Sequence, residues 1–128
     1  MERIEFIRFR SILGKTQSEI AQLLGVSVKA VHSYEQGWRS IPGHVQRQIL
    51  LLVQRKQHVD QPSLPCWTKT ACPEALRRSC PAWEFQGGDI CWFLSGTFCK
   101  GRSFRNWKEK MAECRMCNVF AGIFPPQE

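Results

Sequence analysis

The cysteine residues of this chain are confined to its second half. The first 65 residues contain none, whereas residues 66–128 contain all seven, beginning at Cys66. Four of the five tryptophans lie in the same half, and all three histidines precede Cys66. Such a shift in composition marks a domain boundary. It predicts a cysteine-free module over residues 1–56, a linker over 57–65 and a cysteine-rich module over 66–128.

Charge and hydropathy narrow the class of protein. The chain carries 18 Lys and Arg against 11 Asp and Glu, a formal net charge of +7. A basic balance favours a polyanionic partner, although it also suits a well-solvated surface. The apolar run at residues 49–53 is far too short to cross a bilayer, and the first residues lack the apolar core of a secretory signal. We therefore expect a cytoplasmic protein with no membrane partner.

Helical periodicity and end signals divide the first module into four short helices. Gly14, Gly25 and Gly37 follow the first three helices as C-terminal stops. Thr16 and Glu19 form a capping box at the start of the second helix. The predicted helices cover residues 2–13, 17–24, 27–36 and, opened by Ile41 and Pro42, the stretch to about 56, whose stripe is Val45, Ile49, Leu52 and Val53.

The second and third of these helices form a helix-turn-helix, because a tight turn containing glycine joins them. Small Ala21 lies where the two helices touch, and Gly25 supplies the backbone freedom that the turn needs. The side chains expected to face inward are Ile20, Leu23, Leu24, Val26, Val31 and Tyr34. The stretch TQSEIAQLLGVSVKAVHSYEQGWRSIP thus resembles the phage-repressor-like (XRE, Cro/cI-type) helix-turn-helix family over roughly residues 4–55. The alternative is a helical hairpin with another role.

The resemblance implies double-stranded DNA as the partner, read by the helix that Ser27 begins. The N-terminal part of this helix enters the major groove in the family. There Lys29 is expected to donate to guanine O6 and N7, Ser33 to reach base edges and Val28 to touch a thymine methyl group. His32 is expected to contact a base or a phosphate, or else to be solvated.

Phosphate contacts are implied on either side of the recognition helix. Gln17 begins the preceding helix, whose N-terminus faces phosphate in the family, and Arg39 and Ser40 follow the recognition helix. Arg39 is equally well explained as a solvated loop charge. Glu35 is expected to form an ion pair inside the module instead. The family's usual fifth helix is missing, so a homodimer on palindromic DNA would use the second module or residues 49–53.

The cysteines follow the spacing C-x5-C-x7-C-x10-C-x7-C-x14-C-x2-C. Structural disulfides are disfavoured, because seven is odd and a DNA-binding protein works in a reducing compartment. Zn²⁺ is an alternative, since Cys114 and Cys117 have the spacing of half a tetrathiolate site. An iron–sulfur cluster accepts irregular spacing and uses thiolates almost exclusively. The favoured cofactor is therefore a [4Fe–4S] cluster.

The ligands expected first are the cysteines nearest the closing Cys-x-x-Cys pair. Those four are Cys91, Cys99, Cys114 and Cys117, with Cys66, Cys72 and Cys80 as further candidates. Basic residues follow Cys99 closely, and they either offset the charge of a thiolate-bound centre, extend a DNA-facing surface or are solvated. They are Lys100, Arg102, Arg105, Lys108 and Lys110.

Two Cys-Trp steps, Cys66-Trp67 and Cys91-Trp92, stand 25 residues apart as an internal echo. With Cys99-Lys100-Gly101 and the closing Lys110-x3-Cys114-x2-Cys117, they make residues 64–124 similar to the two-CW type of cysteine-rich module. That module is attached to various bacterial signalling proteins and is thought to carry a redox or metal centre. The resemblance implies a centre of this kind here and assigns no ligand.

The predicted fold is mainly α: a lambda-repressor-like helix-turn-helix bundle followed by a small irregular α+β metal-cluster module. Within the second module we expect short helices over 73–78 and 104–113 and an extended piece over 90–94. So small a core should need a cross-link to stay folded. The predicted function is a sequence-specific transcriptional regulator that senses redox state, oxygen or iron; the alternative is a regulator with a structural zinc module for dimerisation or partner binding. No enzyme is expected, because no Cys/His pair, acid pair or nucleotide loop is present.

Overall fold

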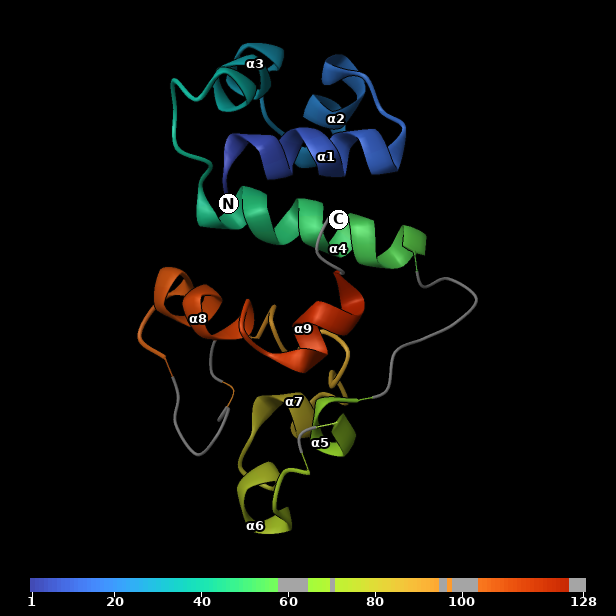
Figure 1. Cartoon of the computed structure of the whole chain (residues 1–128), viewed down its shortest axis with the longest axis vertical. Coiled ribbons are helices and arrows are strands. Elements are labelled where there is room, and N and C mark those ends of the chain that lie inside the picture. The colour runs from blue at the N-terminus through green and yellow to red at the C-terminus, as the bar shows by residue number, and fades with distance from the viewer. Residues whose placement is uncertain (58–64, 70, 95–96, 98–103, 125–128) are drawn as a thin grey trace. The chain divides into compact units, whose positions relative to one another are not determined.

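A computed structural model describes residues 1–57, 65–69, 71–94, 97 and 104–124 of the chain. The chain divides into two compact units, Met1–Gln57 and His58–Glu128. The described residues are mainly helical and contain no strand (Figure 1). None of the helices in these residues is long and apolar enough to cross a membrane.

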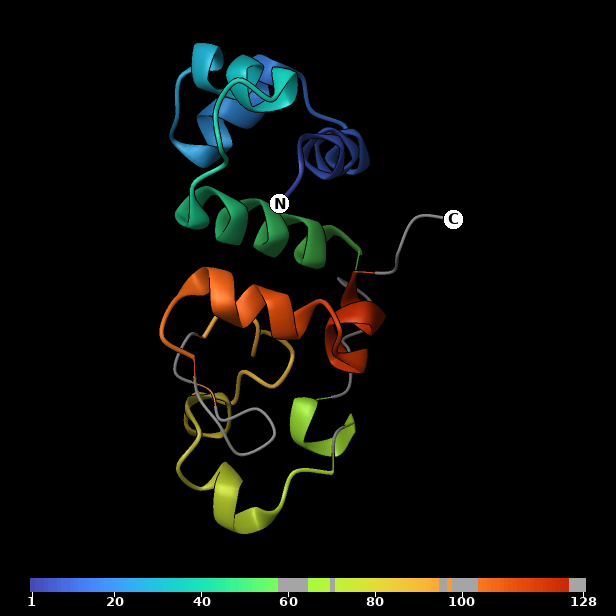
Figure 2. The ribbon, with the colours of Figure 1, turned by 60° about the vertical axis from the view of Figure 1, so that its left-hand side comes forward.

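The first unit contains the four helices that the periodicity predicts. They are α1 (Arg3–Leu13), α2 (Gln17–Leu24), α3 (Val28–Gln36) and α4 (Gly43–Gln57). Helix α1 contacts both α3 and α4, and α2 packs against α3. Figure 2 shows α1 nearly along its axis, with α4 beneath it and the α2–α3 pair beside it. Helix α3 is therefore fixed in the bundle by its contacts with α1 and α2.

Local end signals set the boundaries of α2. The Thr16 hydroxyl accepts a hydrogen bond from the Glu19 N–H (3.1 Å), and the Glu19 carboxylate accepts one from the Thr16 N–H (3.0 Å), which confirms the capping box. The Thr16 hydrogen bonds also lower the pKa of the Glu19 carboxyl. Gly25 ends the helix with φ of +68°, the left-handed conformation that favours glycine.

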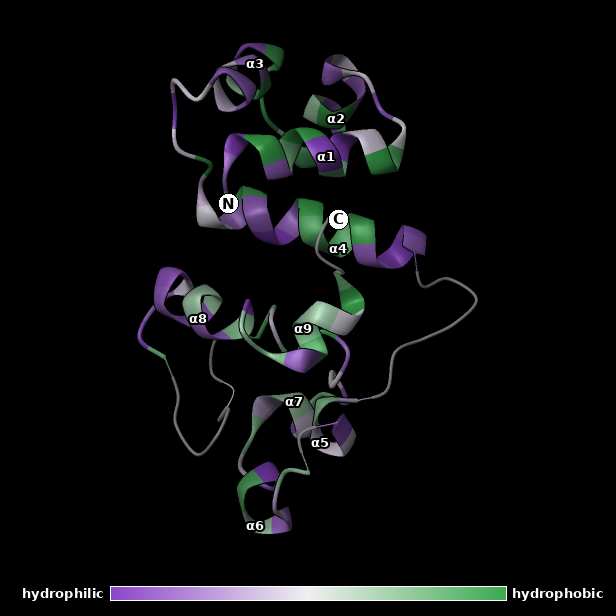
Figure 3. Ribbon diagram, viewed as in Figure 1, coloured by the Kyte–Doolittle hydropathy of each residue, from purple (hydrophilic) through white to green (hydrophobic). Residues whose placement is uncertain are grey.

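The core of the first unit is mostly the predicted one. Apolar bands alternate with polar ones along α1 and α4, as Figure 3 shows, so each helix buries one stripe. Leu23 was expected to be buried but is 50% exposed. The inward face of α2 is formed by Ile20, Ala21 and Leu24, and Leu23 lies off that face. On α4, Leu50 is buried while Leu52 is only half-buried. The buried apolar residues are Phe6, Phe9, Leu13, Ile20, Ala21, Leu24, Ala30, Val31, Tyr34, Ile41, Val45, Ile49, Leu50 and Val53.

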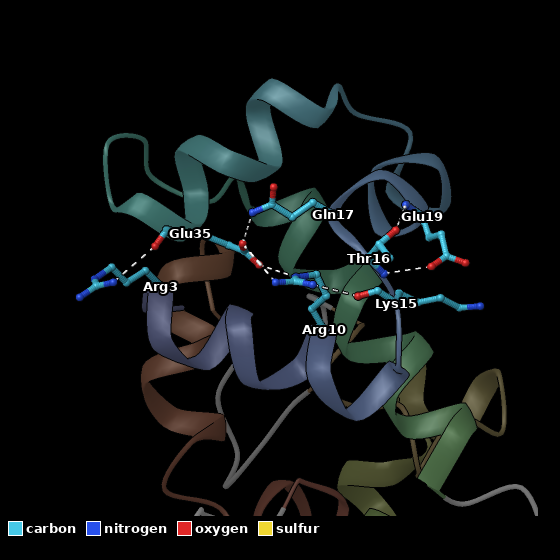
Figure 4. Close-up of polar contacts among 7 residues, drawn as sticks. All are labelled: Arg3, Arg10, Lys15, Thr16, Gln17, Glu19 and Glu35. Carbon is cyan, nitrogen blue, oxygen red and sulfur yellow. Dashed lines mark hydrogen bonds and ion pairs between the residues drawn. The ribbon is translucent and has the colours of Figure 1, made fainter.

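A buried carboxylate ties three helices of the first unit together (Figure 4). Glu35 on α3 is only 5% exposed, and its Oε1 accepts a hydrogen bond from Arg10 Nε of α1 at 2.5 Å. The Gln17 side-chain amide of α2 donates to Oε2 of the same carboxylate. Arg3 adds a hydrogen bond to the Glu35 carbonyl (3.4 Å). The ion pair predicted for Glu35 inside the module is therefore confirmed.

The second unit consists of short helices joined by turns. They are α5 (Cys66–Lys69), α6 (Glu74–Arg77), α7 (Pro81–Glu84), α8 (Trp107–Cys114) and α9 (Asn118–Ile123). Helices α6 and α8 correspond to the two that the sequence predicts. Helix α8 begins three residues later than expected, because the Asn106 side chain caps it by accepting from the Glu109 N–H (2.8 Å).

The prediction of an α+β fold for the second module is wrong in the described residues. The stretch expected to be extended, residues 90–94, forms consecutive turns. The Phe93 N–H donates to the Ile90 carbonyl (2.9 Å), and the Leu94 N–H donates to the Cys91 carbonyl (3.2 Å). These short-range hydrogen bonds satisfy the backbone N–H and C=O groups of the segment. A strand would instead pair those groups with a second strand, and the described residues contain no second strand.

The Glu35 network predicts an unequal cost for removing two carboxylates. Glu35→Ala should lower the free energy of unfolding by roughly 2 kcal/mol, because it leaves a partly buried Arg10 without its charge partner. Glu74→Ala removes the exposed Glu74–Arg78 pair and should cost less than about 0.5 kcal/mol. Urea unfolding of the full chain, followed by circular dichroism, compares the two variants. Equal losses would contradict the structural role given to Glu35.

Candidate functional site

The outward face of α3 presents the side chains predicted to read DNA bases. Val28 is 46% exposed, Lys29 and His32 are exposed, and Ser33 is half-buried. Their spacing puts them on one side of the helix, because residues three and four apart are neighbours on a helical surface. The opposite side carries buried Val31 and the other inward residues of α3. This face can therefore meet a partner without unfolding the bundle.

Two of the predicted DNA contacts are engaged inside the unit. Ser27 caps α3, since its hydroxyl accepts from the Ala30 N–H (3.0 Å). The Gln17 amide donates to Glu35. The hydrogen-bond donors left for a phosphate at the N-terminus of α2 or α3 are therefore mainly backbone N–H groups, as at other helix N-termini.

The turn after α3 exposes a large aromatic side chain that the sequence reasoning passed over. Trp38 is 71% exposed, and its ring meets the ring of His32 edge-on at 5.5 Å between centroids. The guanidinium of Arg39 lies 5.6 Å from the centre of the Tyr34 ring, and Ser40 is exposed. The signal in the sequence was a tryptophan in the turn directly after α3.

The second unit brings six cysteines to one cavity. This cavity has a volume of about 140 Å³. Its cysteines come from α5, from the segments before and after α6, from the turns after α7, from α8 and from the turn before α9. They are separated by up to 51 residues in sequence (117 − 66). The lining cysteines are Cys66, Cys72, Cys80, Cys91, Cys114 and Cys117. Cys99, also predicted as a ligand, lies outside the described residues.

The two Cys-Trp steps meet because a glycine turn allows a close approach. The Cys66 N–H donates to the Gly88 carbonyl (2.9 Å). A side chain at Gly88 would lie 2.6 Å from Pro65 and 2.8 Å from Trp67, so only glycine fits there. The turn carries the chain on to Cys91, whose thiol hydrogen-bonds to that of Cys66. That hydrogen bond is the main cause that lowers the pKa of Cys66 to about 7, against the effect of burial.

The cysteines differ in how deeply they lie. Cys80, Cys91 and Cys114 are buried, whereas the remaining three are half-buried. Cys72 Sγ contacts the Pro73 carbonyl oxygen (3.7 Å), and Cys117 Sγ contacts Asn118 Oδ1 (3.9 Å). The structure thus brings three of the four cysteines predicted first, Cys91, Cys114 and Cys117, to the same cavity as the three further candidates, Cys66, Cys72 and Cys80.

Apolar and aromatic side chains complete the wall of the cavity. Trp67 and Trp83 meet edge-on at 4.9 Å, and buried Trp92 packs against Phe124 at 5.5 Å. Such a shell excludes water and so strengthens the electrostatics of any group inside. The other lining residues are Pro73, Leu76, Arg77, Ala82, Thr97, Glu113, Val119 and Phe120.

The donor set and the size of the cavity bear on which group the cysteines could hold. Thiolates are the ligands of iron–sulfur clusters. A cavity of roughly 150 Å³ accepts a benzene-sized guest, so about 140 Å³ has room for several atoms. Four sulfurs around one zinc ion lie only about 3.8 Å apart, because Zn–S bonds are about 2.3 Å long, and they enclose no comparable space. In the described part of the chain, no group of three or more His, Cys, Asp or Glu is arranged so that it could hold a metal ion.

Comparisons with known proteins add no relative. No family model, curated protein or solved structure matches the chain. The resemblances drawn from the sequence are therefore carried by its residues alone.

The contact between Cys66 and Cys91 predicts a specific pH dependence of thiol reactivity. In metal-free protein, alkylation of Cys66 by iodoacetamide should rise through an inflection near pH 7, because the reactive thiolate forms above the thiol pKa. Cys91→Ala should shift this inflection upward, since it removes the hydrogen bond. Mass spectrometry of each cysteine measures the rates. An inflection near 8.5 in the unchanged chain, the ordinary value, would contradict the assigned contact.

Proposed function

We propose that the chain is a DNA-binding transcriptional regulator whose second unit holds a [4Fe–4S] cluster and responds through it to redox state, oxygen or iron. The observation that carries the proposal is the convergence of six cysteines on one apolar-walled cavity. The DNA-binding part of the proposal is supported by the exposed face of α3, whose opposite side is fixed to α1 through the Glu35 network.

Four of the six cysteines that line the cavity are the proposed ligands. Cys91 and Cys114 are buried and belong to the set favoured by sequence, and Cys66 and Cys80 are the further candidates that contact or approach them from other elements. When bound, such a cluster supplies one-electron redox chemistry and sensitivity to oxidants. The residues of this chain supply the thiolates, the dry wall and the backbone turns that bring the thiolates together.

A structural zinc module for dimerisation or partner binding is the second candidate function. It is favoured by the Cys-x-x-Cys spacing of Cys114 and Cys117, which suits half of a zinc site. The two candidates differ in metal content and in colour, so one preparation separates them.

Anaerobically purified or reconstituted protein should contain iron and acid-labile sulfide in equal amounts, about four of each per chain, and should be brown. Cys91→Ser and Cys114→Ser should abolish the colour, because serine hydroxyls replace thiolate ligands poorly. Cys72→Ser is the matched control and should keep it, since the half-buried Cys72 contacts the neighbouring carbonyl at 3.7 Å. Colourless protein with stoichiometric zinc would support the zinc alternative instead.

The proposed DNA interface is the α3 face together with the turn that follows it. Lys29 and His32 present donors, Val28 presents a methyl surface, and Arg39 lies in the turn where a backbone phosphate would pass. One such helix spans only a few base pairs. We therefore propose a homodimer that places two α3 helices about one helical turn apart on DNA.

Lys29→Ala tests whether α3 reads bases. Binding to the best site selected from random duplexes should weaken by roughly 1–3 kcal/mol, and preference should relax at one base position. Arg55→Ala is the control, because Arg55 is an exposed cation on α4 and should change affinity much less. Fluorescence anisotropy at fixed salt measures both variants. Equal losses on every sequence would make Lys29 a phosphate contact, and no loss would remove α3 from the interface.

A further inference from the structure

Lys110 is the only buried basic side chain that the structure describes. It lies on α8 with an exposed fraction of 0%. Of the basic residues that follow Cys99 in sequence, Arg105 and Lys108 are exposed, and Arg105 pairs with Glu109 at 3.4 Å. Lys110 therefore differs from its neighbours, which have the ordinary place of cations at the surface. A charged group is buried at this depth only when something nearby compensates its lost hydration.

The described neighbours of the Lys110 ammonium are neutral. Nζ donates to the Thr97 hydroxyl at 2.5 Å and lies 5.6 Å from the centre of the Phe104 ring. Among the described residues, no carboxylate lies within ion-pair distance of it. A hydroxyl and a ring face satisfy hydrogen bonding and polarisation in part, but they do not neutralise a full charge.

Lys110 lies directly behind the wall of the cysteine cavity, because its hydrogen-bond partner belongs to that wall. Its partner Thr97 lines that cavity, and so does Cys114, which lies one helical turn further along the same face of α8.

The described wall of the cavity carries two charged side chains of its own, Arg77 and Glu113. Arg77 lines the cavity, and its Nε is buried without a hydrogen-bond partner in the part of the chain that is described. Glu113 is the one acidic side chain among the described lining residues. Among the described residues, one cation and one carboxylate therefore line the space beside the thiols, and the ammonium of Lys110 lies behind Thr97.

We propose that Lys110 is the counter-charge of the thiolate-bound group in the cavity, and that its ammonium sets how firmly this group is held and how readily it is reduced. The inference rests on the proposed function, because it requires a cluster on the cysteines. Four thiolates give such a cluster a net negative charge, and one-electron reduction adds a further negative charge. A fixed ammonium nearby favours both the bound state and the reduced state.

Three variants of the full chain, each reconstituted anaerobically with ferrous iron and sulfide, test this role. Lys110→Met removes the charge and keeps the length of the side chain. Lys110→Arg keeps the charge. Lys108→Met removes an exposed charge two residues away and is the matched control. The readouts are iron and sulfide per chain, the rate of iron release to a chelator, and the midpoint potential of the cluster.

Lys110→Met is expected to release iron at least several-fold faster than the unchanged chain and to have a lower midpoint potential, with a shift larger than that of Lys108→Met. If Lys110→Met takes up no cluster at all, the result for Lys110→Arg decides between charge and shape. Uptake of the cluster by Lys110→Arg supports the need for a positive charge. Failure of both variants to take up the cluster shows that only the shape of the lysine side chain matters, and it overturns the proposal. Unchanged release and potential in Lys110→Met also overturn it. Absence of iron in the unchanged chain would instead remove the proposed function itself.

Discussion

The second unit depends on what fills the space between its cysteines. Its helices have between four and eight residues, and helices this short are not stable alone because nucleation is costly. They gain stability by packing, yet they pack around a cavity of about 140 Å³. Such a cavity reduces folding free energy by roughly 3 kcal/mol when nothing fills it, a large share for a small domain. The proposed cluster, bonded to four thiolates, would replace that loss with cross-links between segments that are distant in sequence.

The first unit is built on an opposite principle, because its own side chains complete its core. The apolar stripes of four helices meet around Phe6, Ile20 and Ile49, and the buried Glu35 carboxylate fixes α3 to α1 and α2. Among the described residues, the polar partners of that carboxylate come from within the unit. The outward face of α3 is therefore a preformed surface, which is what sequence-specific contact with DNA requires.

The ends of the helices in the first unit could be predicted from sequence because their signals are local. Thr16, Glu19 and Gly25 act on residues no more than a few positions away, and the structure confirms each. Burial was less certain, as exposed Leu23 shows, since periodicity alone does not say which of two adjacent leucines faces the core. In the second unit, helices of four residues are too short to show a helical period in the sequence. Helix α9 has only three buried residues, Val119, Phe120 and Ile123, which is too few to predict it.

The site in the second unit could be predicted only as a list of cysteines. Which of them meet depends on long-range events such as the approach of Gly88 to the start of α5, and no local pattern encodes that distance. The echo of Cys66-Trp67 and Cys91-Trp92 was visible in the sequence, but its meaning appears only once the two thiols are in contact. The burial of Lys110 had no local signal either, because it stands in a run of otherwise exposed charges.

The central claim is that the state of the cysteine-bound group controls DNA binding, and one comparison of affinities tests it directly. A two-state switch responds to a ligand only if that ligand favours one arrangement over the other. The affinity for a selected DNA site should therefore be measured at matched salt for cluster-loaded chain, for the same chain after cluster removal, and for Cys114→Ser. The account predicts that loaded and cluster-free chains differ at least several-fold and that Cys114→Ser behaves like the cluster-free chain. Equal affinity in all three would show that the centre is only structural and would contradict the account.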